Sequence, residues 1–135
     1  MNDPADPLAR SAALAIAAGR LGLGVAICAF TRRALAGLGF ERPDAAAIAL
    51  ARLAGGRDIA LGLHGLAARD DPARLAESSA IATAVDAGDG AAFLAAWLAG
   101  DGIGNRAAAV NLPLIAGAVA TGAVVTARLR AAPAT

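Results

Sequence analysis

Two short stretches of the sequence place charged side chains in apolar surroundings. The first is "GRDIALGLH", residues 56–64, and the second is "VDAGD", residues 85–89. Asp86 and Asp89 are three residues apart, a spacing that makes them neighbours on a helix. Two buried carboxylates this close repel each other when both are ionised, so one is expected to keep its proton at neutral pH. An acid beside a base can carry out proton-transfer catalysis or form a proton relay.

Further polar residues are spaced so that they can join this pair. Arg57 and His64 are seven residues apart and project from nearly the same face of a helix. Thr83 lies one turn before Asp86. The candidate catalytic residues are Asp86, Asp89, Arg57 and Asp58. The candidate substrate-binding residues are Arg20, His64, Asn111 and Thr83.

The segments that must position these residues are strongly apolar. Of the 135 residues, 58% are hydrophobic and 17% are charged, against about 45–50% and about 25% in a soluble domain. Crossing a bilayer takes roughly 20 helical residues. Four segments reach that length, residues 8–30, 44–68, 75–99 and 106–127. Because no segment alternates with period two and the connections are short, we expect an all-α protein. Its expected form is a single domain, residues 1–135, folded as an integral membrane antiparallel four-helix bundle.

A soluble, Ala-rich four-helix bundle is the alternative. Each of its helices would need a polar stripe facing water. Residues 11–19, 59–63 and 112–127 contain almost no polar side chains. The sequence therefore favours a membrane protein over a soluble one.

Charges inside a membrane must find partners. Each Arg or Asp near the bilayer centre costs roughly 2.5–3.5 kcal/mol. The apolar segments contain Arg20, Arg57, Asp58, Asp86 and Asp89. We expect the two arginines to pair with the three aspartates, whatever the function.

Small residues indicate where the helices approach closely. Ala18, Gly22 and Ala26 recur every four residues in the first segment, and Ala118 and Gly122 do so in the fourth. Such spacing allows helices to pack tightly in lipid.

Several classes of site are not expected. A net charge of +1 gives no field that would attract nucleic acid. Cys28 is the only cysteine, which excludes an internal disulfide and a thiolate metal cluster. One histidine with scattered carboxylates predicts no metal, and no cofactor is expected. The N-terminus "MNDPADPLAR" is acidic and contains prolines, unlike a secretory signal, so we expect the first helix to be retained.

The motifs "GRDIALGL", "RDDP" and "VDAGD" resemble those of a family of small bacterial four-span membrane proteins of the DoxX-like group. The resemblance implies a four-helix membrane bundle in which Arg57, Asp58, Asp86 and Asp89 are the characteristic polar positions. It implies a multi-pass protein of the bacterial inner membrane and no established reaction. The nine arginines near the ends of the segments divide five to four between the two sides of the membrane, which leaves the orientation open.

Three functions and one structural role fit these residues. The first is an enzyme that opens an epoxide, cyclises or isomerises a small lipophilic substrate, with Asp86 and Asp89 as acid and base oriented by Arg57 and Asp58. The second is a proton-coupled transporter, with a homo-oligomer lining the path. The third is a non-catalytic membrane subunit that anchors a redox partner. The structural role is an ion-pair lock between helices.

Overall fold

The computed structural model describes residues 6–131, which form α-helices joined by short connections. The helices are α1 (Pro7–Ala29), α2 (Thr31–Gly37), α3 (Ala45–Ala67), α4 (Pro72–Ala99) and α5 (Asn105–Ala131). No β-strand occurs within residues 6–131, so the all-α prediction is confirmed. The four apolar segments form α1, α3, α4 and α5, and α5 extends beyond the expected end at residue 127.

Aspartates fix the starts of three helices. Asp6 accepts hydrogen bonds from the N–H groups of Leu8 and Ala9, and Asp44 accepts one from Ala47. Asp71 caps α4 in the same way. A side-chain acceptor at this position satisfies N–H groups that have no partner inside the helix. The Asp-Pro pairs before α1 and α4 also place proline in the first turn, where no N–H is needed.

Helix α2 was not predicted, because residues 31–43, between the first two apolar segments, were expected to form a simple connection. Thr31 starts the helix and is buried, with its hydroxyl donating to the carbonyl of Cys28 and accepting from Arg52 Nε. Leu35 is also buried. These two side chains hold a seven-residue helix between α1 and α3.

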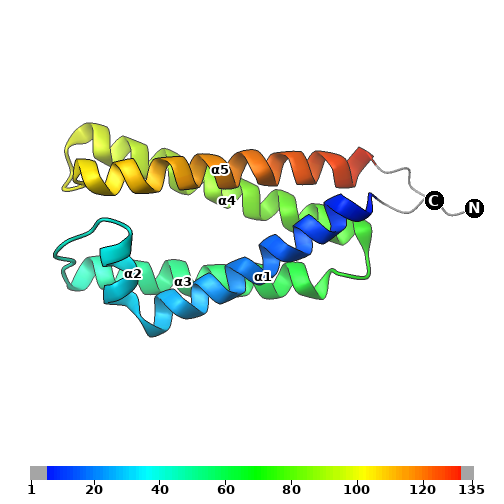
Figure 1. The fold of residues 1–135 in the computed structure, drawn as a ribbon, viewed down its shortest axis with the longest axis horizontal. Coiled ribbons are helices and arrows are strands. Elements are labelled where there is room, and N and C mark those ends of the chain that lie inside the picture. Colours follow the sequence, from blue (N-terminus) through cyan, green and yellow to red (C-terminus); the bar gives the residue numbers. More distant parts are fainter. Residues whose placement is uncertain (1–5, 132–135) are drawn as a thin grey trace, which may run out of the picture.

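The long helices form two pairs. Helix α1 packs mainly on α3, and α4 packs mainly on α5, whereas contacts between the pairs are sparser. Figure 1 shows α4 and α5 running side by side, with α1 crossing α3 beneath them. The start of α1 and the end of α5 lie at one end of the molecule, and α2 lies at the opposite end (Figure 1). The two pairs therefore need specific contacts to hold them together.

Small residues bring α1 and α3 into contact, but on a different face from the one predicted. Ala18, Gly22 and Ala26 are exposed. The contact is made instead by a set that includes Ala17, Gly24 and Cys28 of α1 and Gly55 and Gly62 of α3. Since α1 carries small residues on both faces, spacing alone did not identify the packed one. In the other pair, Gly122 of α5 packs on Thr83 of α4 as a close-contact position.

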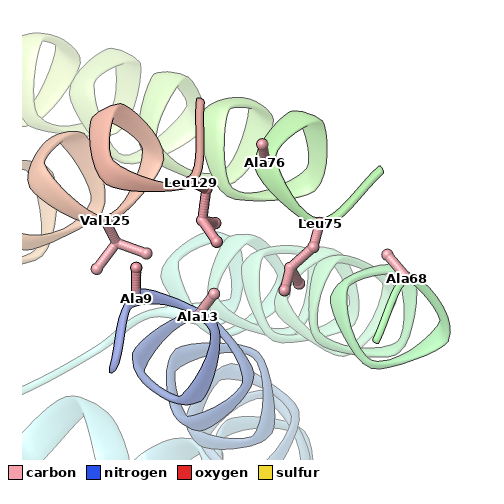
Figure 2. Close-up of a cluster of buried hydrophobic side chains, with 7 residues drawn as sticks. All are labelled: Ala9, Ala13, Ala68, Leu75, Ala76, Val125 and Leu129. Carbon is pink, nitrogen blue, oxygen red and sulfur yellow. The ribbon is translucent and has the colours of Figure 1, made fainter. Parts of the chain in front are cut away.

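Apolar contacts join the two pairs at each end of the molecule. At the end near the start of α1, a buried cluster brings together side chains from both pairs: Ala9, Ala13, Ala68, Leu75, Ala76, Val125 and Leu129. Figure 2 shows Val125 and Leu129 of α5 directed toward Ala9 and Ala13 of α1. At the other end, the Phe40 and Phe93 rings meet edge to face with centroids 6.4 Å apart.

Glycine at position 39 allows the chain before α3 to approach α5. Its φ of 89° is unfavourable for other residues. A Cβ atom there would lie 2.9 Å from the Cα of Ala107. This approach lets Asn111 Nδ2 donate to the carbonyl of Leu38 at 2.8 Å.

Three helices, α1, α4 and α5, are long and apolar enough to cross a membrane. Their outward surfaces carry exposed side chains such as Leu8, Leu98 and Leu114, which are 67%, 72% and 60% exposed. Apolar surface of this extent favours contact with lipid over contact with water. Helix α3, the second expected span, is not among the three because it carries too many charges. Every stretch of 18 residues within it contains three charged residues, Arg52, Arg57 and Asp58.

The close contact between α1 and α3 predicts different effects for two substitutions in one helix. A Cβ atom at Gly24 would lie 2.5 Å from the carbonyl oxygen of Gly55, whereas at Gly22 nothing lies within 4 Å. Gly24→Ala should lower the free energy of unfolding by about 1–3 kcal/mol through overpacking. Gly22→Ala should leave it unchanged or raise it by up to about 1 kcal/mol. Equilibrium unfolding in detergent measures both, and equal effects would contradict this packing.

Candidate functional site

A cavity of about 370 Å³ lies between the two helix pairs. All four long helices contribute to its wall, which consists mostly of Ala, Gly, Ile and Leu residues. The charged residues in the wall are Arg20, Asp58 and Asp86. Pockets for small ligands have this character, an apolar wall with a few polar groups, and begin at about 300 Å³.

Arg20 of α1 connects its own helix pair, α1 and α3, to the second pair, α4 and α5. Its Nη1 lies 3.0 Å from Asp58 Oδ1 on α3, and its Nη2 donates to Asp86 Oδ2 on α4. The same Nη2 also lies 3.4 Å from the carbonyl oxygen of Ala82. The three charged side chains are only 11–17% exposed. A guanidinium held between two carboxylates is therefore the centre of the site, and we call Arg20, Asp58 and Asp86 the inner triad.

Arg57 and Asp89 form a second ion pair outside the cavity. Arg57 Nη1 lies 2.8 Å from Asp89 Oδ1, and Nη2 lies 2.6 Å from Oδ2. These side chains are 36% and 46% exposed. A weaker contact of 3.7 Å joins Arg57 Nη2 to Asp58 Oδ1. We call Arg57 and Asp89 the outer pair.

The structure does not combine Asp86 and Asp89 into one acid-base pair as the sequence suggested. Three residues advance a helix by about 300°, some 60° short of a full turn. The two carboxylates therefore face different arginines. Asp86 lines the cavity beside Arg20, and Asp89 binds Arg57 at the rim.

His64 and several hydroxyl groups continue the polar surface away from the inner triad. His64 Nδ1 lies 3.0 Å from Ser78 Oγ, and Ser78 is part of the cavity wall. Thr83, a predicted binding residue, also lies in the wall and donates its hydroxyl to the carbonyl of Ser79 at 2.8 Å. As their spacing predicted, Arg57 and His64 both face α4.

Two threonines of α5 were missed. Thr126 is buried and its hydroxyl donates to Ser79 Oγ at 2.9 Å, and Thr121 lies in the cavity wall. They are the only hydroxyl-bearing residues in α5. That isolation in an apolar helix was the signal that could have revealed them.

Asn111 lies elsewhere. Its side-chain amide donates to the carbonyls of Leu38 and Ala107, both at 2.8 Å, and it is not part of the cavity wall. Its side chain joins α5 to the connection before α3. Asn111 therefore holds the two helix pairs together and does not contact a substrate in the cavity.

Two polar atoms at the centre have no hydrogen-bond partner among the described residues. They are the buried Nε atoms of Arg20 and Arg57. A buried N–H without a partner carries a cost of about 1–3 kcal/mol.

Within residues 6–131, no three His, Cys, Asp or Glu side chains are arranged to hold a metal ion. Arginine occupies the space between the carboxylates of the inner triad.

Comparison with protein-family models, with curated proteins and with solved structures finds no match for this chain. The resemblance to DoxX-like proteins therefore stays a prediction, and the functional interpretation depends on the geometry of the cavity.

The inner triad and the outer pair should contribute differently to stability. Arg20→Gln leaves two buried carboxylates without their cation and should lower the free energy of unfolding by about 3–5 kcal/mol. Arg57→Gln breaks the more exposed pair and should cost about 1 kcal/mol or less. Unfolding of the two variants in the same detergent compares them directly. Equal losses would show that the inner triad is not the main link between the helix pairs.

Proposed function

We propose that α3 crosses the membrane together with α1, α4 and α5, so that the chain is a four-span protein of the bacterial inner membrane. Helix α3 has 23 residues, the same length as α1. Asp58 is paired with Arg20 inside the molecule, and Arg57 is paired with Asp89 at the rim of the cavity. Its outward side carries exposed Leu50, Leu53 and Leu63. Its average hydropathy is therefore lower than that of the surface it would present to lipid.

Labelling of single cysteines tests this topology. In a Cys28→Ser background, Arg33→Cys and Asp101→Cys mark the ends of α1 and α4, and Asp70→Cys marks the connection between α3 and α4. If all four helices cross, a membrane-impermeant maleimide should label positions 33 and 101 from one side and position 70 from the other. If α3 does not cross, positions 33 and 70 would be labelled from the same side and position 101 from the opposite one.

For the reaction, we propose proton-transfer catalysis on a small lipophilic molecule held in the cavity. The observation that carries this proposal is the position of two carboxylates, Asp58 and Asp86, in the wall of a mostly apolar cavity. Both side chains are largely shielded, and Arg20 fixes their positions. Fixed charges act more strongly on a reacting molecule in an apolar site than in water, because there is less water to screen them.

The inner triad suits a reaction in which the substrate becomes positively charged. With one guanidinium and two carboxylates, the triad is electrically neutral when it holds one proton. Donation of that proton to an alkene or an epoxide oxygen would leave a carbocation beside a carboxylate. Loss of a proton from a neighbouring carbon to the same carboxylate would form the new double bond and restore the acid. Isomerisation, epoxide opening and cyclisation all follow this balanced scheme.

Deuterium incorporation provides a test that does not require the substrate to be known in advance. The protein in lipid nanodiscs would be incubated in ²H₂O with a panel of lipophilic alkenes and epoxides. Mass spectrometry would detect isomerised or cyclised products and the deuterium they carry. Asp86→Asn should reduce product formation at least about 100-fold, as expected for loss of a general acid-base group.

The matched control is the double variant Arg57→Gln/Asp89→Asn, which removes the outer pair without changing the net charge. It should retain product formation, because neither residue lines the cavity. Circular dichroism would show whether each variant is folded. Loss of folding in Asp86→Asn would favour the ion-pair lock, and full activity in a folded Asp86→Asn would contradict the catalytic role.

The separation of the molecule into two helix pairs favours proton-coupled transport as the second candidate. The pairs enclose the cavity and contact each other sparsely, an arrangement that would allow one pair to rock against the other. Proton-dependent uptake into proteoliposomes, without chemical change of the solute, would support transport over catalysis.

A further inference from the structure

The polar centre contains more carboxylates than guanidinium groups. Asp58, Asp86 and Asp89 are paired with two arginines, which leaves one negative charge. Arg57 and Asp89 neutralise each other through two short contacts of 2.8 and 2.6 Å. The excess charge therefore belongs to the inner triad, which faces the cavity.

The neighbouring ionisable groups do not remove this excess. The groups that line the cavity or pack against it are Arg20 from α1, Arg57, Asp58 and His64 from α3, and Asp86 and Asp89 from α4. The residues that α5 contributes to the wall are Gly117, Ala118, Thr121 and Gly122, and none of them is ionisable. His64 is outside the wall and is hydrogen-bonded to Ser78.

The excess charge is presented to the cavity through open carboxylate oxygens. Arg20 binds Oδ1 of Asp58 and Oδ2 of Asp86. The other oxygen of each carboxylate accepts no hydrogen bond from the described part of the chain, and neither is among its buried unpaired atoms. Both aspartates line the cavity, and Asp58 as a whole is only 8% exposed to the surroundings.

We propose that the preferred occupant of this cavity is a lipophilic monocation, such as a substituted ammonium ion with an apolar body. Its positive charge would balance the inner triad, and its apolar part would lie against the Ala, Ile and Leu wall. Burying an uncompensated charge is costly, so a cation that enters gains a large electrostatic contribution that a neutral molecule lacks. The inference rests on the proposed function and names its substrate class, because a carbocation formed in the cavity is also a lipophilic monocation.

A permanent cation and its uncharged isostere test this inference. Benzyltrimethylammonium and neopentylbenzene have nearly the same shape and differ in charge. Isothermal titration of the protein in nanodiscs of zwitterionic lipid, with empty nanodiscs as the blank, should show at least about tenfold tighter binding of the cation. Equal binding of the two compounds, or binding of neither, would overturn the inference.

Variants locate the charge that is responsible. Asp58→Asn and Asp86→Asn each neutralise the excess and should weaken binding of benzyltrimethylammonium at least about tenfold. The charge-neutral double variant Arg57→Gln/Asp89→Asn should bind it as the wild type does. Circular dichroism identifies variants that have lost their fold. Since two separate aspartates are tested, unfolding of one leaves the other to decide, and a folded aspartate variant that binds normally would contradict the proposal.

Competition with protons gives an independent readout on the wild-type protein. Benzyltrimethylammonium carries no acidic proton, so it competes with any proton that binds to the inner triad. Its affinity should therefore rise with pH, by up to about tenfold per unit while the site is protonated. An affinity that is independent of pH, together with equal binding of neopentylbenzene, would overturn the inference.

The outcomes also separate this inference from the proposed reaction. Product formation with no preference for the cation would leave the proton-transfer proposal standing and overturn the inference. Preference for the cation without any product would support the inference and refute catalysis. The excess charge would then serve binding or exchange of a cation for a proton.

Discussion

The guanidinium of Arg20 is the contact on which the rest of the molecule depends. It comes from one helix pair and binds carboxylates from both, near the middle of α1, α3 and α4. The other links between the pairs are the Arg57–Asp89 ion pair, the apolar contacts at the two ends and single polar contacts such as His64 with Ser78 and Asn111 with Leu38. A cavity between loosely packed helices can stay open only if something spans it. Arg20 does this inside the cavity, and the outer pair of Arg57 and Asp89 joins α3 to α4 at its rim.

Much of the fold could be predicted because the sequence marks it locally. The aspartates before α1, α3 and α4 are strong helix-starting signals, and the apolar segments between them are long enough to define the helices. Two features of the fold were not predicted correctly. Helix α2 depends on a hydroxyl bridge from Thr31 to Arg52, which is distant in sequence. The packed face of α1 was chosen wrongly because Ala and Gly occur on both sides, and only the partner glycines of α3 decide between them.

For the site, the sequence supported the general conclusion and missed the assignments. Counting charges was enough to expect that the arginines and aspartates meet, and they do. It could not show which arginine each aspartate binds, since Asp86 and Asp89 are neighbours on α4 and diverge by only a fraction of a turn. Asn111 and Thr126 are single polar residues near opposite ends of α5, and the sequence does not show what each of them contacts. Asn111 donates to the carbonyl of Leu38 in the connection before α3, and Thr126 donates to Ser79 of α4.

The location of the cavity between the helix pairs has a consequence for how a substrate would be supplied. Apolar contacts occupy both ends of the molecule, with the Leu75 and Leu129 cluster at one and the Phe40 and Phe93 rings at the other. If the four helices span the bilayer as proposed, a solute reaches the polar centre sideways through the seams between the pairs. Its saturation would then follow its mole fraction among the lipids, not its concentration in the surrounding water. Two compounds with equal affinity for the protein would differ in apparent KM by the ratio of their partition coefficients.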